Sequence, residues 1–199
     1  LNMKLKEIFN LIDEKSFHKA KQELILLKKG ENSYDDINFT IAQVNTQIGE
    51  FNEAKKNFQE HLKINPKDYI ALFYLGNLYM KTYDIDKVEK LYLKVLELKK
   101  NYIPAIINLA YFYNGVGNLN KAKQYYLRAI EIDPNNINYH YSLSRLDINY
   151  IDEKKIKFLL NFLDEGEKNK KDFYLINFIL SKYYEKINNY SKEIDFLNK

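Results

Sequence analysis

The chain has 199 residues, of which 46% are hydrophobic and 29% are charged, a composition that is ordinary for a folded protein and argues against a disordered tail. It contains no cysteine, which excludes disulfides, thiolate metal sites and cysteine nucleophiles and fits a cytoplasmic location. The formal net charge of +4 is mild and both signs are mixed along the chain, so we expect no basic face for nucleic acid. The uninterrupted apolar runs are short, so we expect no segment that spans a membrane.

Residues of similar character recur along the chain at a constant interval of 34 residues, as from Ala20 to Ala54. Two columns hold mostly small residues and a third holds large ones: Ala20, Ala54, Val88, Ala122 and Ile156; Ile8, Ala42, Gly76, Ala110 and Ser144; Leu24, Phe58, Tyr92, Tyr126 and Leu160. Independent columns that agree on one interval predict an internal repeat.

In chain order, the repeats are predicted to begin near residues 1, 35, 69, 103, 137 and 174 of a single domain over 1–199. Their ranges are 1–34, 35–68, 69–102, 103–136, 137–173 and 174–199. From Ser144 to Ser181 the interval is 37 residues. We therefore expect about three extra residues in the fifth repeat, within 164–171.

Each repeat is predicted to contain two helices, and the fourth shows this most clearly. Apolar residues recur every three or four positions over 106–113, which indicates one face of a helix. A Gly-Val-Gly-Asn stretch at 115–118 ends that helix, and a second helix follows over 119–130, before Pro134. A nucleotide-binding glycine loop would need a preceding strand and a third glycine, and neither is present.

These patterns resemble the tetratricopeptide repeat (TPR) family. The resemblance rests on the 34-residue interval and on "YLGNLY" at 74–79, "NLAYFY" at 108–113, "GEFNEAKKNF" at 49–58 and "GNLNKAKQYYLRAIEIDP" at 117–134. It implies an all-α, right-handed superhelical solenoid of antiparallel helix pairs, with about six repeats and the last one incomplete. The terminal repeats depart from the pattern, and Asn45 and Asp147 stand in a column that is otherwise aromatic.

In this family the first helix of each pair lines a concave groove that holds a peptide. Carried over to this sequence, the groove residues are Phe39, Gln43, Phe73, Asn77, Ile107, Asn108, Tyr111, Tyr141 and Arg145. Aromatic anchors and amide groups suit apolar side chains and a peptide backbone. The alternative is that these rings only pack between neighbouring helices.

The resemblance therefore implies a non-catalytic scaffold with a peptide or protein ligand. Some TPR domains clamp the acidic carboxyl termini of chaperones with lysine and arginine residues. Here the corresponding positions hold Phe73, Asn138 and Ser142, so the charges that would pair with carboxylates are missing and such a clamp is not expected.

The chain offers no constellation for catalysis, metal binding or a cofactor. Its three histidines, His18, His61 and His140, fall in different repeats without neighbouring ligands, so a structural role is expected for each. No Ser-His-Asp or Cys-His arrangement can be assembled from the repeats. We expect no enzyme activity in these residues.

Residue 199 falls inside the second helix of the sixth repeat, which would leave Ile194, Phe196 and Leu197 uncovered. Either the native protein continues or this end packs on another copy, which makes a homo-oligomer an alternative.

The end of the chain also resembles the TPR region that precedes the catalytic domain of certain bacterial TPR–sulfotransferase proteins. The match is carried by His140, Leu143, Ser144, Phe178, Leu180, Tyr190, Phe196 and Leu197. It implies a second hypothesis, in which this chain is the amino-terminal module of a larger enzyme whose catalytic domain follows residue 199.

Overall fold

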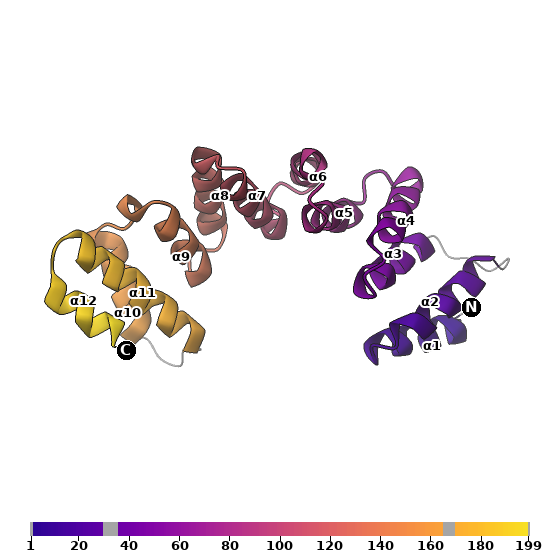
Figure 1. Ribbon diagram of the computed structural model, residues 1–199, viewed down its shortest axis with the longest axis horizontal. Coiled ribbons are helices and arrows are strands. Elements are labelled where there is room, and N and C mark those ends of the chain that lie inside the picture. The colour runs from indigo at the N-terminus through magenta and orange to yellow at the C-terminus, as the bar shows by residue number, and fades with distance from the viewer. Residues whose placement is uncertain (1, 30–35, 165–169, 199) are drawn as a thin grey trace. The chain divides into compact units, whose positions relative to one another are not determined.

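The computed structural model describes residues 2–29, 36–164 and 170–198, and within them the chain forms helices and no strand (Figure 1). The prediction of an all-α repeat fold is confirmed. The chain divides into two compact units, unit 1 (Leu1–Ala105) and unit 2 (Ile106–Lys199).

Over the described residues, the helices follow one another as six antiparallel pairs. In the first three pairs they are α1 (Asn2–Asp13), α2 (Phe17–Lys29), α3 (Ile37–Gln47), α4 (Phe51–Ile64), α5 (Tyr69–Lys81) and α6 (Ile85–Leu98). In the last three they are α7 (Ile103–Gly115), α8 (Leu119–Ile132), α9 (Ile137–Leu146), α10 (Glu153–Asp164), α11 (Lys170–Lys186) and α12 (Tyr190–Leu197), with a short 3-10 helix, η1 (Ile148–Tyr150), after α9. The sixth pair begins at Lys170 rather than 174, and most of the predicted insertion, 165–169, lies outside the described residues.

One backbone geometry ends the first helix in five of the described pairs. The second residue after the helix takes a left-handed conformation, with φ between 58° and 83°, at Lys15, Gly49, Tyr83, Gly117 and Asn188. The next amide then donates back into the helix, as Asp84 N does to the Tyr79 carbonyl at 2.9 Å. This is the Schellman arrangement, which glycine adopts freely and tyrosine only with steric strain.

The fifth pair departs from this geometry. Helix α9 ends early at Leu146, and Asp147 is extended, with φ −147° and ψ 101°. The Asp147 side chain accepts a hydrogen bond from Asn149 N and pairs with Lys123 Nζ at 2.5 Å. The η1 turn that follows brings Ile151 into the core, where it is buried.

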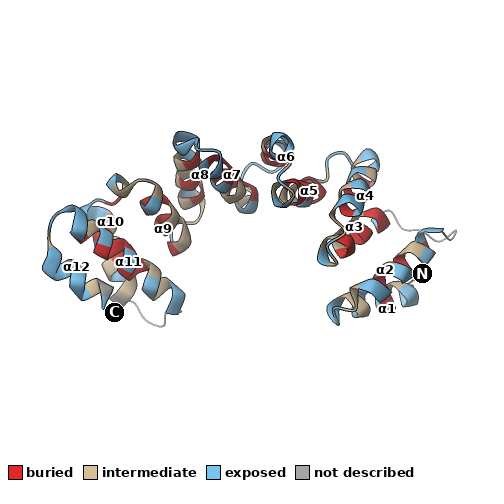
Figure 2. Cartoon of the chain, viewed as in Figure 1, coloured by how far each residue is buried: buried red, intermediate tan, exposed pale blue. Residues whose placement is uncertain are grey.

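Small residues lie where the two helices of a pair meet, as their columns predicted. Ala42, Ala54, Ala110 and Ala122 are completely buried, and buried residues gather on the facing sides of the helices (Figure 2). At Gly76 a Cβ would lie only 2.7 Å from Cε1 of Tyr92. A short side chain at these points is what lets the helices approach.

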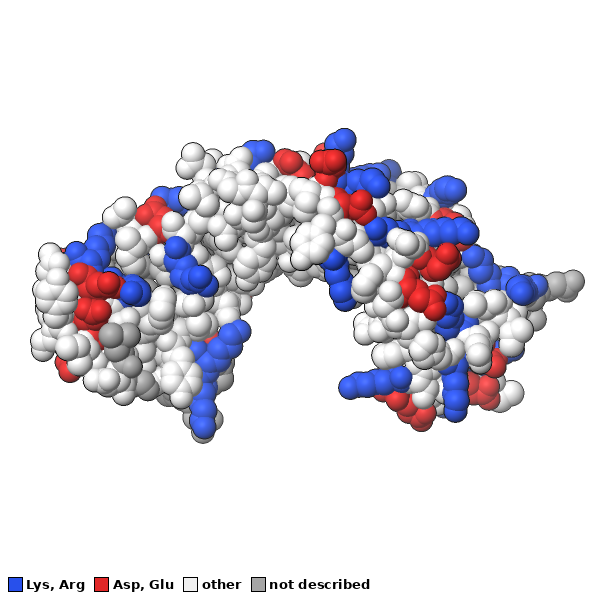
Figure 3. Space-filling model, viewed as in Figure 1, with Lys and Arg blue, Asp and Glu red and all other residues white. Residues whose placement is uncertain are grey.

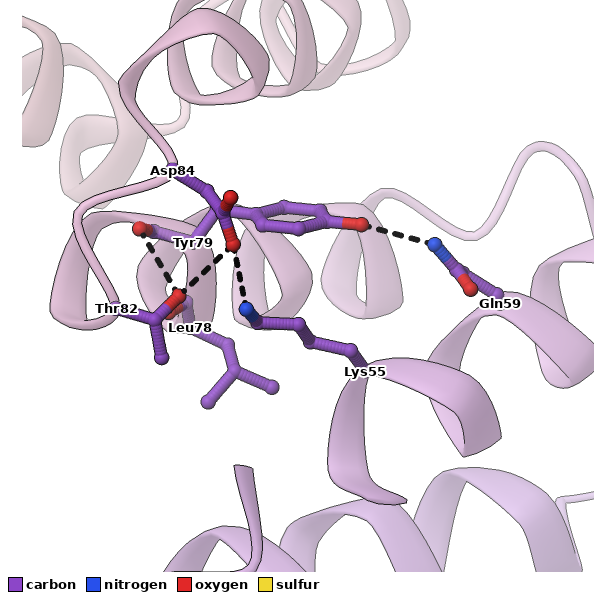
Figure 4. Close-up of polar contacts among 6 residues, drawn as sticks. All are labelled: Lys55, Gln59, Leu78, Tyr79, Thr82 and Asp84. Atoms are coloured by element: carbon purple, nitrogen blue, oxygen red, sulfur yellow. Dashed lines mark hydrogen bonds and ion pairs between the residues drawn. The ribbon is translucent and has the colours of Figure 1, made fainter. Parts of the chain in front are cut away.

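A column of tyrosines closes the space between one repeat and the preceding second helix. In the third repeat the Tyr79 hydroxyl accepts a hydrogen bond from Gln59 Nε2 on α4 at 2.8 Å (Figure 4). Lys55, also on α4, lies 5.1 Å from the Tyr79 ring and pairs with Asp84 Oδ2 at 2.5 Å. A lysine on the repeat's own second helix also lies over the ring, in the pairs Lys87–Tyr79, Lys121–Tyr113 and Lys192–Tyr184.

Charges of both signs are interspersed on the visible face (Figure 3). In the part of the chain that the structure describes, no helix is long and apolar enough to cross a membrane.

Candidate functional site

The predicted groove residues occupy one face of the first helices because they repeat three or four positions apart. Unit 1 contributes Phe39 and Gln43 from α3, and Phe73 and Asn77 from α5. Unit 2 contributes Ile107, Asn108 and Tyr111 from α7, and Tyr141 and Arg145 from α9.

In unit 1 the predicted anchors are half-buried among other rings. Phe39 meets Phe58 edge-on, with ring centroids 5.7 Å apart, and lies 6.0 Å from Tyr74. Phe73 lies 5.3 Å from Tyr102, again edge-on. These contacts give both phenylalanines a packing role.

Asn77 is likewise engaged in unit 1, because its Oδ1 accepts a hydrogen bond from the Tyr92 hydroxyl at 2.7 Å. That bond orients the amide and gives the hydroxyl of Tyr92, a completely buried residue, a hydrogen-bond acceptor. Asn77 therefore supports the pair α5–α6 whatever else it contacts.

Unit 2 presents an open cleft, which we call the α7–α9 cleft. It has a volume of about 270 Å³ and is lined by Tyr111, Asn114, Tyr126, Tyr141, Ser142, Arg145 and Leu146. Tyr111 is 49% exposed and meets the Tyr126 ring edge-on at 5.9 Å. Three predicted residues, Tyr111, Tyr141 and Arg145, thus lie together, whereas Ile107 and Asn108 are not in the lining.

The floor of the α7–α9 cleft carries a tyrosine that stays protonated. Burial, helped by the nearby Tyr111, raises the pKa of Tyr126 to about 12, against smaller opposing effects of its hydrogen bond with Ser142 and of the Arg145 charge. A neutral hydroxyl in this position both donates and accepts hydrogen bonds.

A second hollow adjoins the first and shares Arg145 with it. It has a volume of about 470 Å³ and is lined by Ser144, Arg145, Ile148, Phe178, Lys182, Glu185 and Lys186. The rings of Tyr141 and Phe178 meet edge-on at 5.3 Å, and the Arg145 guanidinium lies 5.8 Å from the Tyr141 ring. The two hollows therefore form one surface with an aromatic ridge and cationic side chains.

Sequence reasoning missed Tyr126, Ser142 and Leu146 as lining residues. From the sequence, Tyr126 is known only as a member of a column of large residues on the second helices, and Ser142 only as a clamp position that lacks a cation. Ser142 directly follows Tyr141 and lies about one helical turn before Arg145, so the helical geometry of α9 places it beside these two residues.

Two of the three histidines, His61 and His140, are held by structural contacts. His61 Nε2 lies 2.8 Å from Asp68 Oδ2, and Asp68 also caps α5 by accepting from Ile70 N and Ala71 N. His140 Nε2 lies 2.8 Å from the Pro134 carbonyl oxygen. Among the described residues, no group of three or more His, Cys, Asp or Glu side chains is placed to hold a metal ion.

Four of the eight residues behind the sulfotransferase resemblance lie in the core. His140, Leu143, Ser144 and Leu180 are all buried. They indicate the repeat fold and carry no information on a further domain. The expectation that Phe196 is uncovered is wrong, because its ring stacks on Tyr184 with centroids 5.6 Å apart; the side chain of Leu197 lies outside the described set.

The chain is similar to known repeat proteins. A model of the tetratricopeptide repeat family matches residues 35–68 and 103–136. PilF of Pseudomonas aeruginosa has a TM-score of 0.71 and 13% identity, covering 98% of this chain and 87% of that one. MamA (41 to the end) of Desulfovibrio magneticus RS-1 has a TM-score of 0.68 and 19% identity, covering 77% of this chain and 87% of that one.

A third solved structure, the first TPR of Spaghetti (RPAP3) bound to an HSP90 peptide, SRMEEVD, has a TM-score of 0.54. It is 16% identical and covers 58% of this chain and 92% of that one. At these identities the likeness is one of fold. No curated protein matches the chain.

Proposed function

We propose that this chain, in which a tetratricopeptide repeat model matches residues 35–68 and 103–136, is a non-catalytic scaffold that binds a peptide or protein segment along the first helices of its repeats. The α7–α9 cleft carries the proposal, because Tyr111, Tyr141 and Arg145 line one open surface there. Such a mixture of rings and polar groups suits a peptide's apolar side chains and backbone. We expect an affinity on the order of micromolar, about −8 kcal/mol.

Each residue has a proposed role. Tyr111 and Tyr141 anchor apolar side chains of the ligand, and Arg145 selects for an acidic group or a carbonyl oxygen. The remaining predicted residues serve as a secondary contact surface on their own helices: Phe39, Gln43, Phe73, Asn77, Ile107 and Asn108. We place the protein in the cytoplasm, because a chain without cysteine suits a reducing compartment.

The proposed ligand differs from the acidic peptide bound by the Spaghetti domain. The clamp positions named above hold Phe73, Asn138 and Ser142, and Asn138 Nδ2 donates to Asn136 Oδ1 at 3.2 Å. Since no cation stands at these three positions, we expect the peptide SRMEEVD to bind at least about tenfold more weakly than a peptide selected on this chain.

The test is selection of peptides from a random phage library on the full chain, followed by fluorescence anisotropy with the enriched peptide. Tyr111→Ala combined with Arg145→Ala should weaken binding at least about tenfold, because it removes a ring contact and a charge-assisted hydrogen bond. A matched control, Tyr174→Ala with Lys157→Ala, changes exposed residues outside the cleft. Equal binding by both double variants, with helical circular dichroism retained, would overturn the proposal.

Self-association through α12 is a second proposal, and one observation favours it. Tyr190 and Ile194 are 59% and 54% exposed on this helix, and exposed apolar side chains of this kind commonly contact a partner. Light scattering over a range of concentrations should then show a mass that rises with concentration. A monomer at every concentration would remove the idea.

A further inference from the structure

The second repeat contains a pocket on the side of α3 that faces away from the predicted groove residues. It has a volume of about 480 Å³ and lies between α2, α3 and α4. Ile41 and Asn45 line it from α3. The groove residues Phe39 and Gln43 each lie two positions before one of these, which is about 200° around the helix axis and therefore nearly on the opposite side. A ligand in this pocket would therefore not contact the groove face of α3.

In this pocket an asparagine stands where the third, fourth and sixth repeats carry a ring. Asn45 is the second repeat's member of the column that holds Tyr79, Tyr113 and Tyr184. In the third repeat, Gln59 and Lys55 of the preceding second helix contact the Tyr79 ring and its hydroxyl. One interval earlier, the corresponding residues are Ile25 and Lys21, and both line the pocket instead of a ring.

Asn45 also carries an unsatisfied polar atom. The residue is 1% exposed, and its Oδ1 has no hydrogen-bond partner in the described chain. A buried carbonyl oxygen without a donor is costly, so native proteins usually supply one. The other amide in the lining, Asn57, already donates through Nδ2 to the Glu53 carbonyl at 2.8 Å.

Two of the four charged residues in the lining, which are Lys21, Lys28, Lys29 and Glu53, form ion pairs. Lys21 forms an ion pair with Glu50, and Lys28 pairs with Glu60 at 3.0 Å. The pocket offers a ligand an apolar wall from Ile25 and Ile41, lysine side chains beside it, and at Asn45 a buried acceptor that has no donor. Lysines favour an electron-rich ring through cation–π attraction, and Oδ1 requires a donor.

We propose that this pocket is a second binding site, which accepts the side chain of a tyrosine from a partner protein. The ring packs on Ile25 and Ile41 and its hydroxyl donates to Asn45 Oδ1. The partner thereby restores the ring that the second repeat lacks. Phenylalanine would fill the space but leave Oδ1 unsatisfied, so tyrosine is preferred.

The first experiment uses p-cresol, which has the chemistry of a tyrosine side chain, and isotope-labelled isoleucine methyl groups of the full chain. The Ile25 and Ile41 signals should shift saturably with p-cresol and about fivefold more weakly with toluene, which lacks the hydroxyl. Tyr111→Ala, in the α7–α9 cleft, should leave this binding unchanged. Shifts equally strong with toluene, or absent with both probes, would overturn the proposal.

Two variants of Asn45 sharpen the result. Asn45→Tyr supplies the missing ring within the chain, so p-cresol binding should fall at least about tenfold while the thermal midpoint rises. Asn45→Leu removes the amide, and with it the acceptor, at similar side-chain size, so the preference for p-cresol over toluene should disappear even if Asn45→Tyr fails to fold. Retained p-cresol preference in Asn45→Leu would contradict the assigned hydrogen bond.

A second experiment tests whether the tyrosine comes from a protein. Random peptides selected on the wild type and counter-selected on Asn45→Tyr should be enriched in tyrosine, and exchanging that tyrosine for phenylalanine should weaken binding about fivefold. If p-cresol binds but no tyrosine peptide is enriched, the site serves a small phenol and the proposed partner protein is wrong.

Discussion

Gly76 shows most directly how a single residue sets the helix spacing. A Cβ at this position would lie 2.7 Å from Cε1 and 3.0 Å from Cδ1 of Tyr92, a side chain that is completely buried. Because the ring has no room to retreat, Gly76→Ala should lower the free energy of unfolding by about 1–3 kcal/mol. Urea denaturation followed by circular dichroism measures this.

The matched control is Gly115→Ala, since a Cβ on Gly115 would have no heavy atom within 4 Å. There the free energy of unfolding should stay unchanged or rise by up to about 1 kcal/mol, because alanine restricts the unfolded chain. An equal loss in both variants would mean that backbone propensity, and not the Tyr92 contact, decides the choice of glycine at 76.

At Tyr83 a residue other than glycine stands in a backbone conformation that favours glycine. It takes the left-handed conformation that glycine takes at the same place in neighbouring repeats, and its side chain is 85% exposed. Relief of strain should outweigh the added freedom of the unfolded chain, so Tyr83→Gly should raise the free energy of unfolding by about 0.5–1 kcal/mol.

Tyr174 supplies the comparison for Tyr83, because it is 60% exposed but lies within helix α11. Tyr174→Gly should lower the free energy of unfolding by about 0.5–1 kcal/mol, since glycine weakens a helix interior. The same urea titration measures both changes, and effects of equal sign would refute the role assigned to the turn.

At the scale of elements, His140 ties α9 to the segments before and after it. Its Nε2 lies 2.8 Å from the Pro134 carbonyl oxygen and its Nδ1 lies 2.7 Å from the Tyr150 hydroxyl. Burial lowers the pKa of His140 below its ordinary value of 6.5, although the contact with Pro134 acts the other way. The folded chain therefore binds a proton here less readily than the unfolded chain.

This shift predicts how stability depends on pH. The unfolded state takes up more protons than the folded state once the pH falls below about 6.5, so the stabilising contribution of neutral His140 is lost progressively as the pH falls towards the lowered pKa. His140→Gln should reduce the slope of unfolding free energy against pH between about pH 7 and 5. The control variant is His18→Gln, at an exposed residue. A slope of unfolding free energy against pH that is unchanged in His140→Gln would contradict the prediction.

The sequence predicted the elements better than the contacts between them. Small residues and left-handed turn positions repeat every 34 residues because each helix pair meets the same local constraints. The early end of α9 at Leu146 was not predicted, because it depends on Lys123 from another helix pairing with Asp147. A residue that departs from its column, such as Asp147, indicates that the local structure differs there. It does not indicate which contact replaces the one that the other repeats make.

The candidate site was predicted only in part, because the repeat spacing predicts the helix face of a residue but not its contacts with other helices. Spacing on the first helices brought Tyr111, Tyr141 and Arg145 to one cleft. The same spacing did not reveal that Phe73 packs on Tyr102, a residue between two repeats. Periodicity defines the face on which a side chain lies, whereas its exposure depends on the size of side chains from neighbouring helices.

At the scale of the whole molecule, the chain comprises two compact units, Leu1–Ala105 and Ile106–Lys199. In a repeat protein the stability is approximately a sum of local terms, because each repeat contacts only its neighbours. We therefore expect Gly76→Ala to speed hydrogen exchange of buried amides in unit 1 about tenfold or more, while amides around Leu143 in unit 2 change little. Exchange read out by mass spectrometry resolves the two units.

The reciprocal variant is Ala122→Leu, which overpacks a completely buried position of unit 2 and should cost about 1–3 kcal/mol. It should speed exchange around Leu143 and leave the amides around Leu75 in unit 1 nearly unchanged. If each variant instead accelerates exchange equally throughout the chain, the six helix pairs unfold in one cooperative step. A ligand bound to either unit would then stabilise both, whereas independent units would confine its effect to the repeats that it contacts.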